Sequence, residues 1–147
     1  MDAFEAVSAS RPSSARSKRY FTPAEATRSL TLVRRIVQEV VLDYRQLREL
    51  HEKCRPVRGK GRTAEAEAAR QRYLAITDHL SDLKEELDKV GCELKDCEEG
   101  LIDFPGRIEG REISLCWKLG EEKVAHWHEP DSGFAGRQPI DETLFSI

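Results

Sequence analysis

Apolar residues recur at alternating steps of three and four positions along two stretches of the chain. In the first stretch these positions are Ala26, Leu30, Val33, Val37, Val40, Tyr44 and Leu47. In the second they are Ala66, Ala69, Tyr73, Ile76, Leu80, Leu83, Leu87 and Val90. A mean step of about 3.5 residues is that of a heptad seam, in which one face of a helix packs against another helix. The pattern predicts two long helices with coiled-coil-like packing.

Local signals mark where both helices begin and end. Thr22 is the expected N-cap of a capping box, because a glutamate follows three residues later. The first helix is expected to end near Cys54, because Pro56 follows. The second helix is expected to begin near Thr63 and to stop at Gly91. A short connection makes such helices antiparallel. We therefore expect a long antiparallel helical hairpin over residues 20–91.

After the helices the apolar period changes to two. Residues 101–104 predict a short strand that is stopped by a Pro-Gly pair, and residues 112–119 alternate between apolar and polar positions. A turn then returns the chain through residues 123–128. These features predict a small antiparallel β module over residues 92–147, with a Gly- and Pro-rich C-terminal loop that wraps it. The expected fold class is α+β.

A three-residue turn after the alternating strand fixes a register for the returning strand. In this register Cys116 faces His126 across the strands. The two tryptophans, Trp117 and Trp127, then lie together on the packed face of the module. His126 and His128 lie with Cys116 on the opposite face.

Composition excludes few classes of protein. Of the 147 residues, 39% are hydrophobic and 35% are charged, which suits long solvent-exposed helices. No run approaches the roughly 18 apolar residues of a membrane span, and the N-terminal residues do not have the pattern of a secretory signal. We therefore expect a cytoplasmic protein with no membrane partner. Its cysteines are expected to be separate thiols, and a zinc site at Cys92 and Cys97 lacks the usual second pair.

The net charge of −3 is unevenly distributed along the chain. Residues 1–80 hold 16 Lys and Arg against 10 Asp and Glu, a balance of +6. Residues 81–147 hold 8 against 17, a balance of −9. Residues 1–19 are rich in Ser, Ala and basic residues and almost free of large apolar ones, so we expect a disordered basic tail. A solubilising role for this tail is favoured over contact with nucleic acid.

The connection between the two predicted helices carries only positive charge. Its basic residues are Arg55, Arg58, Lys60 and Arg62. This basic tip could bind RNA, DNA or an acidic protein. It has no interleaved aromatic residue for base stacking, and a solvated loop is the simpler interpretation.

Several blocks of the chain, taken in order, have a familiar pattern. They are Tyr20-Phe21-Thr22-Pro23-Ala24-Glu25-Ala26, Gly91-Cys92-Glu93-Leu94-Lys95-Asp96, Gly100-Leu101-Ile102-Asp103-Phe104-Pro105, Leu115-Cys116-Trp117-Lys118-Leu119-Gly120-Glu121, Trp127-His128-Glu129 with Asp131, and Gly133-Phe134-Ala135-Gly136-Arg137-Gln138-Pro139-Ile140. Together they resemble a bacterial family known as domain of unknown function 2203, over roughly residues 20–140. The resemblance implies no activity, because none is established for the family. The family motif leaves His126 outside, which weakens any site that needs it.

The strand that ends at His128 is the first candidate for chemistry. His126 and His128 share one strand face, a workable spacing for two metal ligands. Asp103, Glu129 and Asp131 could add oxygen ligands for a divalent metal. The simpler interpretation is a solvated strand face, with His128 holding the loop after it by a hydrogen bond.

A second candidate is an anion clamp made by Asp131 and Arg137, since arginine binds carboxylates and phosphates through two hydrogen bonds. The simpler interpretation pairs these two residues with each other to fix the glycine-rich loop. That loop lacks the strand–loop–helix setting and the lysine of a phosphate-binding loop. The residues singled out for binding are Asp103, Trp117, Trp127, His128, Glu129, Asp131, Phe134 and Arg137.

Two functional hypotheses follow. The first is a non-enzymatic interaction module or homo-oligomeric scaffold, because wide apolar stripes indicate self-association and no catalytic set is legible. It would bind an unidentified protein partner through the C-terminal module. The alternative is a metal-binding protein or metal-dependent enzyme that uses His128 with nearby carboxylates.

Overall fold

The computed structural model describes residues 18–53 and 63–145 of the chain. Its helices are α2 (Pro23–Lys53) and α3 (Ala64–Val90). They are followed by the strands β1 (Glu93–Asp96), β2 (Leu101–Ile108), β3 (Arg111–Lys118), β4 (His126–His128) and β5 (Gln138–Pro139), and by the short 3-10 helices η1 (Phe134–Gly136) and η2 (Glu142–Phe145). The α+β class is confirmed. The predicted basic tip, and the predicted tail apart from its last two residues, lie outside the described residues.

Both helices begin where the sequence signals place them, and α3 also ends at its expected glycine. The Thr22 hydroxyl accepts a hydrogen bond from the Glu25 amide at 3.1 Å, and the Glu25 carboxylate accepts one from the Thr22 amide at 3.0 Å. Thr63 caps α3, and Gly91 ends it with a φ of 103°, in the left-handed region that favours glycine. Within the described residues, neither helix has an apolar stretch long enough to cross a membrane.

The described strands form one antiparallel sheet in the order β1-β2-β3-β4-β5. The register predicted for the returning strand is confirmed where β3 and β4 pair, because Leu115 pairs with Trp127 and Cys116 pairs with His126. The returning strand begins only at His126, whereas residues 123–128 were expected to form it. Strands β1 and β5, which no alternating pattern had marked, extend the sheet at its two edges.

The expected end of the first strand at Pro105 is wrong, because β2 continues to Ile108. The carbonyl of Pro105 accepts a hydrogen bond from the Phe21 amide at 2.7 Å, so the backbone of Pro105 is directed away from β3. In an antiparallel strand the N–H and the carbonyl of one residue point to the same side, so an N–H at position 105 would also point away from β3, beyond the end of β1. Proline has no N–H, but β2 therefore loses no hydrogen bond to β3. The residues just before α2 thus cover the edge that β1 leaves free.

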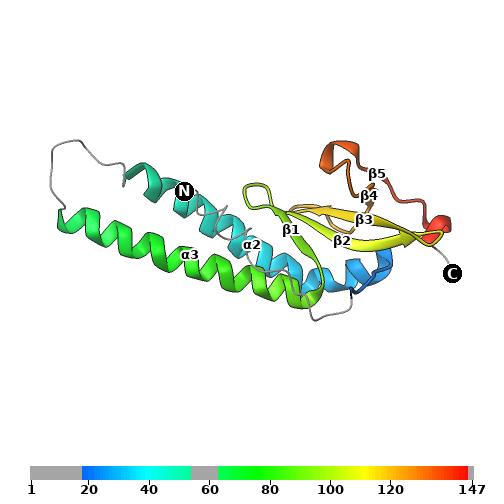
Figure 1. The fold of residues 1–147 in the computed structure, drawn as a ribbon, viewed down its shortest axis with the longest axis horizontal. Helices are drawn as coiled ribbons and strands as arrows, with labels where there is room; N and C mark the ends of the chain where they lie inside the picture. Colours follow the sequence, from blue (N-terminus) through cyan, green and yellow to red (C-terminus); the bar gives the residue numbers. More distant parts are fainter. Residues whose placement is uncertain (1–17, 54–62, 146–147) are drawn as a thin grey trace.

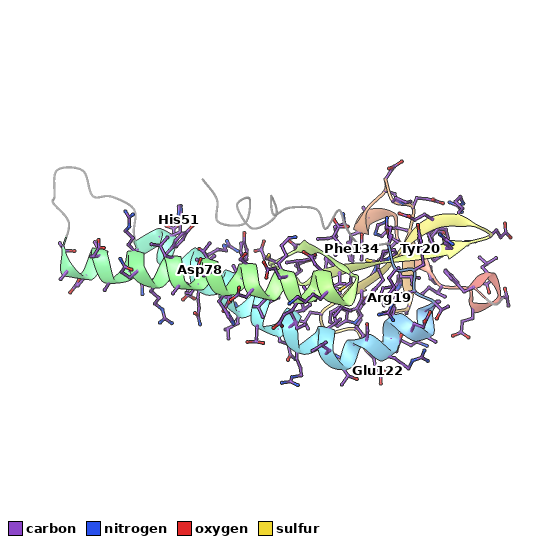
Figure 2. The ribbon with its side chains drawn as sticks, turned by 60° about the horizontal axis from the view of Figure 1, so that its bottom comes forward. Arg19, Tyr20, His51, Asp78, Glu122 and Phe134 are labelled. Atoms are coloured by element: carbon purple, nitrogen blue, oxygen red, sulfur yellow. The ribbon has the colours of Figure 1, made fainter. Side chains whose placement is uncertain are left out.

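The sheet lies across one face of the helical pair, over the beginning of α2 and the end of α3 (Figure 1). The buried side chains of both layers form one core, which includes Leu30, Val33, Val37, Leu87, Ile102, Phe104, Leu115 and Trp117. The outer parts of the helices, which carry His51 and Asp78, extend beyond the sheet (Figure 2). The sheet covers the inner part of the apolar stripes whose exposure led us to expect self-association. The homo-oligomer therefore stays a prediction.

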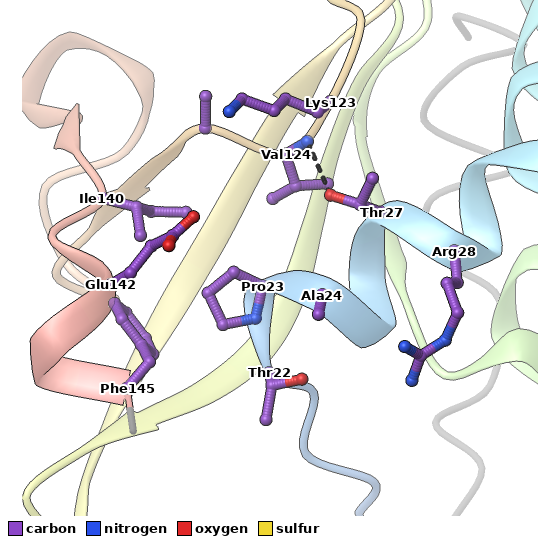
Figure 3. A pocket seen from close by; sticks show the side chains of 11 residues that line it. Thr22, Pro23, Ala24, Thr27, Arg28, Lys123, Val124, Ile140, Glu142 and Phe145 are labelled. Carbon is purple, nitrogen blue, oxygen red and sulfur yellow. Dashed lines mark hydrogen bonds between the residues drawn. The ribbon is translucent and has the colours of Figure 1, made fainter.

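The C-terminal residues are bound to the start of α2 through the segment before β4. The Val124 amide donates to the Thr27 hydroxyl at 3.1 Å (Figure 3), and the Ile140 amide donates to the Ala125 carbonyl at 2.9 Å. A cleft of about 510 Å³ remains between α2 and residues that include Phe145. These contacts set the path of the chain on both sides of β4.

Gly100, in the turn between β1 and β2, lies close against α2. Its φ is 76°, and a Cβ at this position would lie 2.8 Å from Val37 Cγ1 and 2.9 Å from Leu119 Cβ. Both distances are shorter than side chains tolerate. The absence of a side chain therefore allows the turn to pack on the helix.

Replacing Gly100 by Ala should destabilise the protein more than replacing Gly110, which has a φ of 79° but open space around it. Both variants carry the strain of a left-handed alanine, and only Gly100→Ala adds overpacking, which costs roughly 1–3 kcal/mol. Urea unfolding followed by tryptophan fluorescence measures the difference. Equal losses would show that the turn is not packed against α2.

A polar contact crosses the two helices midway along their length. Asp43 on α2 is buried, and its carboxylate is paired with Nδ1 of His79 on α3. The Glu39 carboxylate lies 3.7 Å from the other ring nitrogen. The hydrogen bond to Asp43 raises the pKa of His79, against the opposing effect of burial.

This pair should make stability depend on pH. Because the pKa of His79 is higher in the folded state, its contribution is fully present below the unfolded pKa of about 6.5 and is lost as the pH rises through the folded pKa. The His79 side chain is 47% exposed, so we expect a contribution below about 1 kcal/mol. The loss of unfolding free energy in His79→Gln should be larger at pH 5.5 than at pH 8.5. A loss that is equal at both values would exclude the charged pair.

Candidate metal centre

The face of the sheet turned away from the helices carries a row of polar side chains. Asp103 on β2 lies opposite Cys116 on β3, which in turn lies opposite His126 on β4. His128 pairs with Ser114, whose small side chain leaves room for the imidazole to extend across β3 towards β2. The ladder thus brings together three of the residue types that bind metals, from three strands.

The part of this face that holds Asp103, Cys116 and His128 is not solvated, and the simpler sequence interpretation is wrong on that point. Asp103 is 6% exposed, Cys116 1% and His128 2%. The segment between β4 and β5, drawn in orange, folds back over the sheet on the side opposite the helices (Figure 1). It converts an ordinary strand face into a buried polar layer.

Both ring nitrogens of His128 are engaged. Nδ1 lies 2.7 Å from the Glu129 carbonyl oxygen, which can only accept, so Nδ1 donates its hydrogen. Nε2 lies 3.1 Å from each carboxylate oxygen of Asp103. A carboxylate and an unprotonated nitrogen are both acceptors, so a proton or another cation has to lie between them.

Cys116 completes a group of three. One ligand atom from each of Asp103, Cys116 and His128 lies within 4.8 Å of the other two. Burial raises the pKa of the Cys116 thiol to about 11, and burial also raises the pKa of Asp103, although the charge of His128 opposes it. The thiol is therefore protonated at neutral pH unless a cation replaces its proton.

The arrangement does not suit a cysteine nucleophile. Such a nucleophile needs a base that is free to take its proton and a lowered thiol pKa. Here the two nitrogens of His128 are directed at Glu129 and Asp103, and the pKa of Cys116 is raised. Convergence of one oxygen, one sulfur and one nitrogen instead fits a transition metal, since calcium and magnesium prefer oxygen ligands alone.

Arg137, just before β5, is held over this group. Its two terminal nitrogens lie 3.0 and 2.6 Å from the two carboxylate oxygens of Glu121, and its guanidinium also interacts with Cys116. The Phe134 ring lies 4.4 Å from the guanidinium carbon. Glu121 thus takes the place that the sequence interpretation had given to Asp131, which is exposed.

Glu121 is itself fixed by the end of β3. Its backbone carbonyl accepts a hydrogen bond from the Trp117 indole at 2.9 Å, and its carboxylate accepts one from the Lys118 amide at 2.8 Å. Burial opposes ionisation of Glu121, but the Arg137 and Lys118 hydrogen bonds outweigh it and lower the pKa. Trp117 therefore packs in the core and also holds Glu121, the partner of Arg137, in place.

The other predicted site residues are dispersed. Trp127 is buried in the core, and Phe134 is 38% exposed. The Glu129 carboxylate pairs with Arg111 at the surface. Nδ1 of His126 lies 3.8 Å from the Glu121 carboxylate, outside the group of three.

The sequence pattern did not mark Cys116 as a ligand or Glu121 as the partner of Arg137. The predicted register already placed Cys116 on the face of His126 and His128. The pairing of Cys116 with Asp103 could not be predicted without the register between β2 and β3. That register was not predicted, because the first strand was expected to stop at Pro105.

Replacing His128 by Ala should lower the free energy of unfolding by roughly 3–5 kcal/mol, because it leaves the buried Asp103 carboxylate without its partner. His126→Ala is the matched control, since the His126 side chain is 29% exposed, and we expect a loss below about 1 kcal/mol. Urea unfolding of the metal-free proteins measures both. Similar losses in the two variants would contradict the buried pair.

Comparison with known proteins gives a family without an assigned chemistry. A family model described as "Uncharacterized conserved protein (DUF2203)" matches residues 19–140. No curated protein and no solved structure matches the chain.

Proposed function

The chain belongs to DUF2203, a family of uncharacterised conserved proteins, and we propose that it binds a divalent transition metal through Asp103, Cys116 and His128. The observation that carries this proposal is the orientation of His128. Its Nδ1 is committed to the Glu129 carbonyl, which leaves the lone pair of Nε2 directed at the Asp103 carboxylate. Histidines that bind metals are commonly oriented by such a hydrogen bond from the second nitrogen.

The spacing of the three ligand atoms suits a tetrahedral metal such as zinc. Bond lengths of about 2.0–2.3 Å place neighbouring ligand atoms about 3.5 Å apart. The three atoms now lie within 4.8 Å of one another. Small side-chain rotations, moving the atoms by about 1 Å, would close the site and leave a fourth position for water.

The charges also balance. An ionised Asp103 and a Cys116 thiolate together neutralise a divalent cation, and His128 binds in its neutral form. The metal-free site holds one proton between His128 and Asp103 and a second on the thiol, whose pKa is about 11. Binding of the metal therefore releases two protons, and affinity should rise with pH.

Titration of the metal-free protein with Co²⁺ tests the proposal. We expect one equivalent to bind and to give a sulfur-to-cobalt charge-transfer band, which Zn²⁺ then abolishes by displacement. Cys116→Ser should remove the band, and Asp103→Asn should weaken binding at least tenfold. The control is Cys92→Ser, which alters a buried thiol that donates to the Leu87 carbonyl, away from the group of three.

Proton release gives a second readout of the same titration. In a weak buffer at pH 7, an indicator dye should report two protons per metal ion for the unchanged protein and one for Cys116→Ser. A missing charge-transfer band, or one that survives in Cys116→Ser, would refute the metal centre.

The interaction-module hypothesis ranks second. It is supported by Leu42 on α2 and Leu74 on α3, which are 51% and 46% exposed. Single exposed leucines are common on protein surfaces, so these two carry less weight than three buried, converging ligand atoms.

A further inference from the structure

Residues 129–137, here called the cover segment, close the polar layer on the side opposite the helices (Figure 1). None of these nine described residues is buried. A segment without buried side chains contributes little to the core and opens locally at a small free-energy cost. What keeps it closed must come from its polar contacts.

The cover segment is tied down by an ion pair near each end. At its start, Glu129 pairs with Arg111, and these side chains are 44% and 53% exposed. At its end, Arg137 pairs with Glu121, and these are 18% and 24% exposed. The second pair is less accessible to solvent and joins two guanidinium nitrogens to two carboxylate oxygens, whereas Arg111 reaches Glu129 through one nitrogen, so the second pair is the stronger contact.

The stronger tie is also the one over the ligands. The Arg137 guanidinium lowers the pKa of the Cys116 thiol, against the larger effect of burial, and the Phe134 ring lies against this guanidinium at 4.4 Å. A guanidinium has no lone pair to offer, so Arg137 cannot be a metal ligand. Its position closes the layer above Cys116 without joining the coordination sphere.

We propose that the Glu121–Arg137 pair is the latch of the metal centre, holding the cover segment closed and setting how fast a metal ion enters and leaves. This inference rests on the proposed function. Arg137 and Glu121 are positioning residues in it. The three ligands have side chains that solvent scarcely reaches, 3% exposed for His128 and 8% for Asp103, so exchange requires the cover to lift.

A latch leaves a distinctive kinetic signature. The Glu121–Arg137 contact does not involve the metal, so breaking it favours the open form of both the metal-free and the loaded protein. Association and dissociation then accelerate together, and the dissociation constant stays nearly unchanged. An electrostatic effect of Arg137 on the Cys116 thiolate would instead change the affinity.

The test is stopped-flow release of Co²⁺ into excess chelator. Loss of a hydrogen bond between charged groups predicts roughly tenfold faster release in both Arg137→Gln and Glu121→Gln. Glu121→Gln keeps the guanidinium that favours the Cys116 thiolate, so its dissociation constant should stay within about threefold of the unchanged protein. Arg137→Lys, which keeps the charge but not the two-pronged contact, should be intermediate. The control Arg111→Gln, which breaks the exposed pair, should change release less than about twofold.

Amide hydrogen exchange of the metal-free protein tests the latch independently of metal binding. Amides of residues 129–137 should exchange faster in Arg137→Gln and Glu121→Gln than in Arg111→Gln. If the protein binds no metal, the proposed function fails while this arm still reports on the cover. Unchanged exchange and unchanged release in Arg137→Gln, or weaker affinity at an unchanged release rate, would overturn the latch.

Discussion

The antiparallel ladder between β2 and β3 is the contact on which both faces of the sheet depend. It joins eight residue pairs without interruption. On one face it aligns Phe104 with Leu115, which pack into the core between the sheet and the helices. On the other face it aligns Asp103 with Cys116. Side chains alternate strictly along a strand, so a slip of one residue would move the carboxylate into the apolar core. The core and the polar layer are therefore specified by one register.

Among the residues that the structure describes, two buried carboxylates pair with histidines, and their surroundings give them different roles. Asp43 pairs with His79 at the edge of the helix interface, where the imidazole is 47% exposed and can exchange its protons with water. Asp103 meets His128 beneath the cover segment, where both side chains are at most 8% exposed. A carboxylate in the second setting is costly to ionise without a close cation. The same chemistry acts as a helix contact in one place and as a candidate binding centre in the other.

The polar layer lies between the strands β2 and β3, which are rigid, and the cover segment, which is held by few contacts. Asp103 and Cys116 are held by long strands, and the Glu121 carboxylate is fixed by Trp117 and Lys118 at the end of β3. The cover contributes no buried residue among positions 129–137, and its main tie is Arg137. Ligands on rigid strands keep their geometry, while a cover fixed by polar contacts can open without disturbing the core.

The sequence by itself determined the features that short-range chemistry governs. The capping box at Thr22, the glycine stop at Gly91 and the facing of Cys116 and His126 depend on residues close together in the chain, where spacing is informative. Only the tertiary structure decided the rest. Pro105 stays in a strand because Phe21, distant in the chain, covers its open edge, and Arg137 meets Glu121 because the cover folds back over β3. Pairings between distant segments depend on the sum of many weak contacts, which periodicity along the chain does not encode.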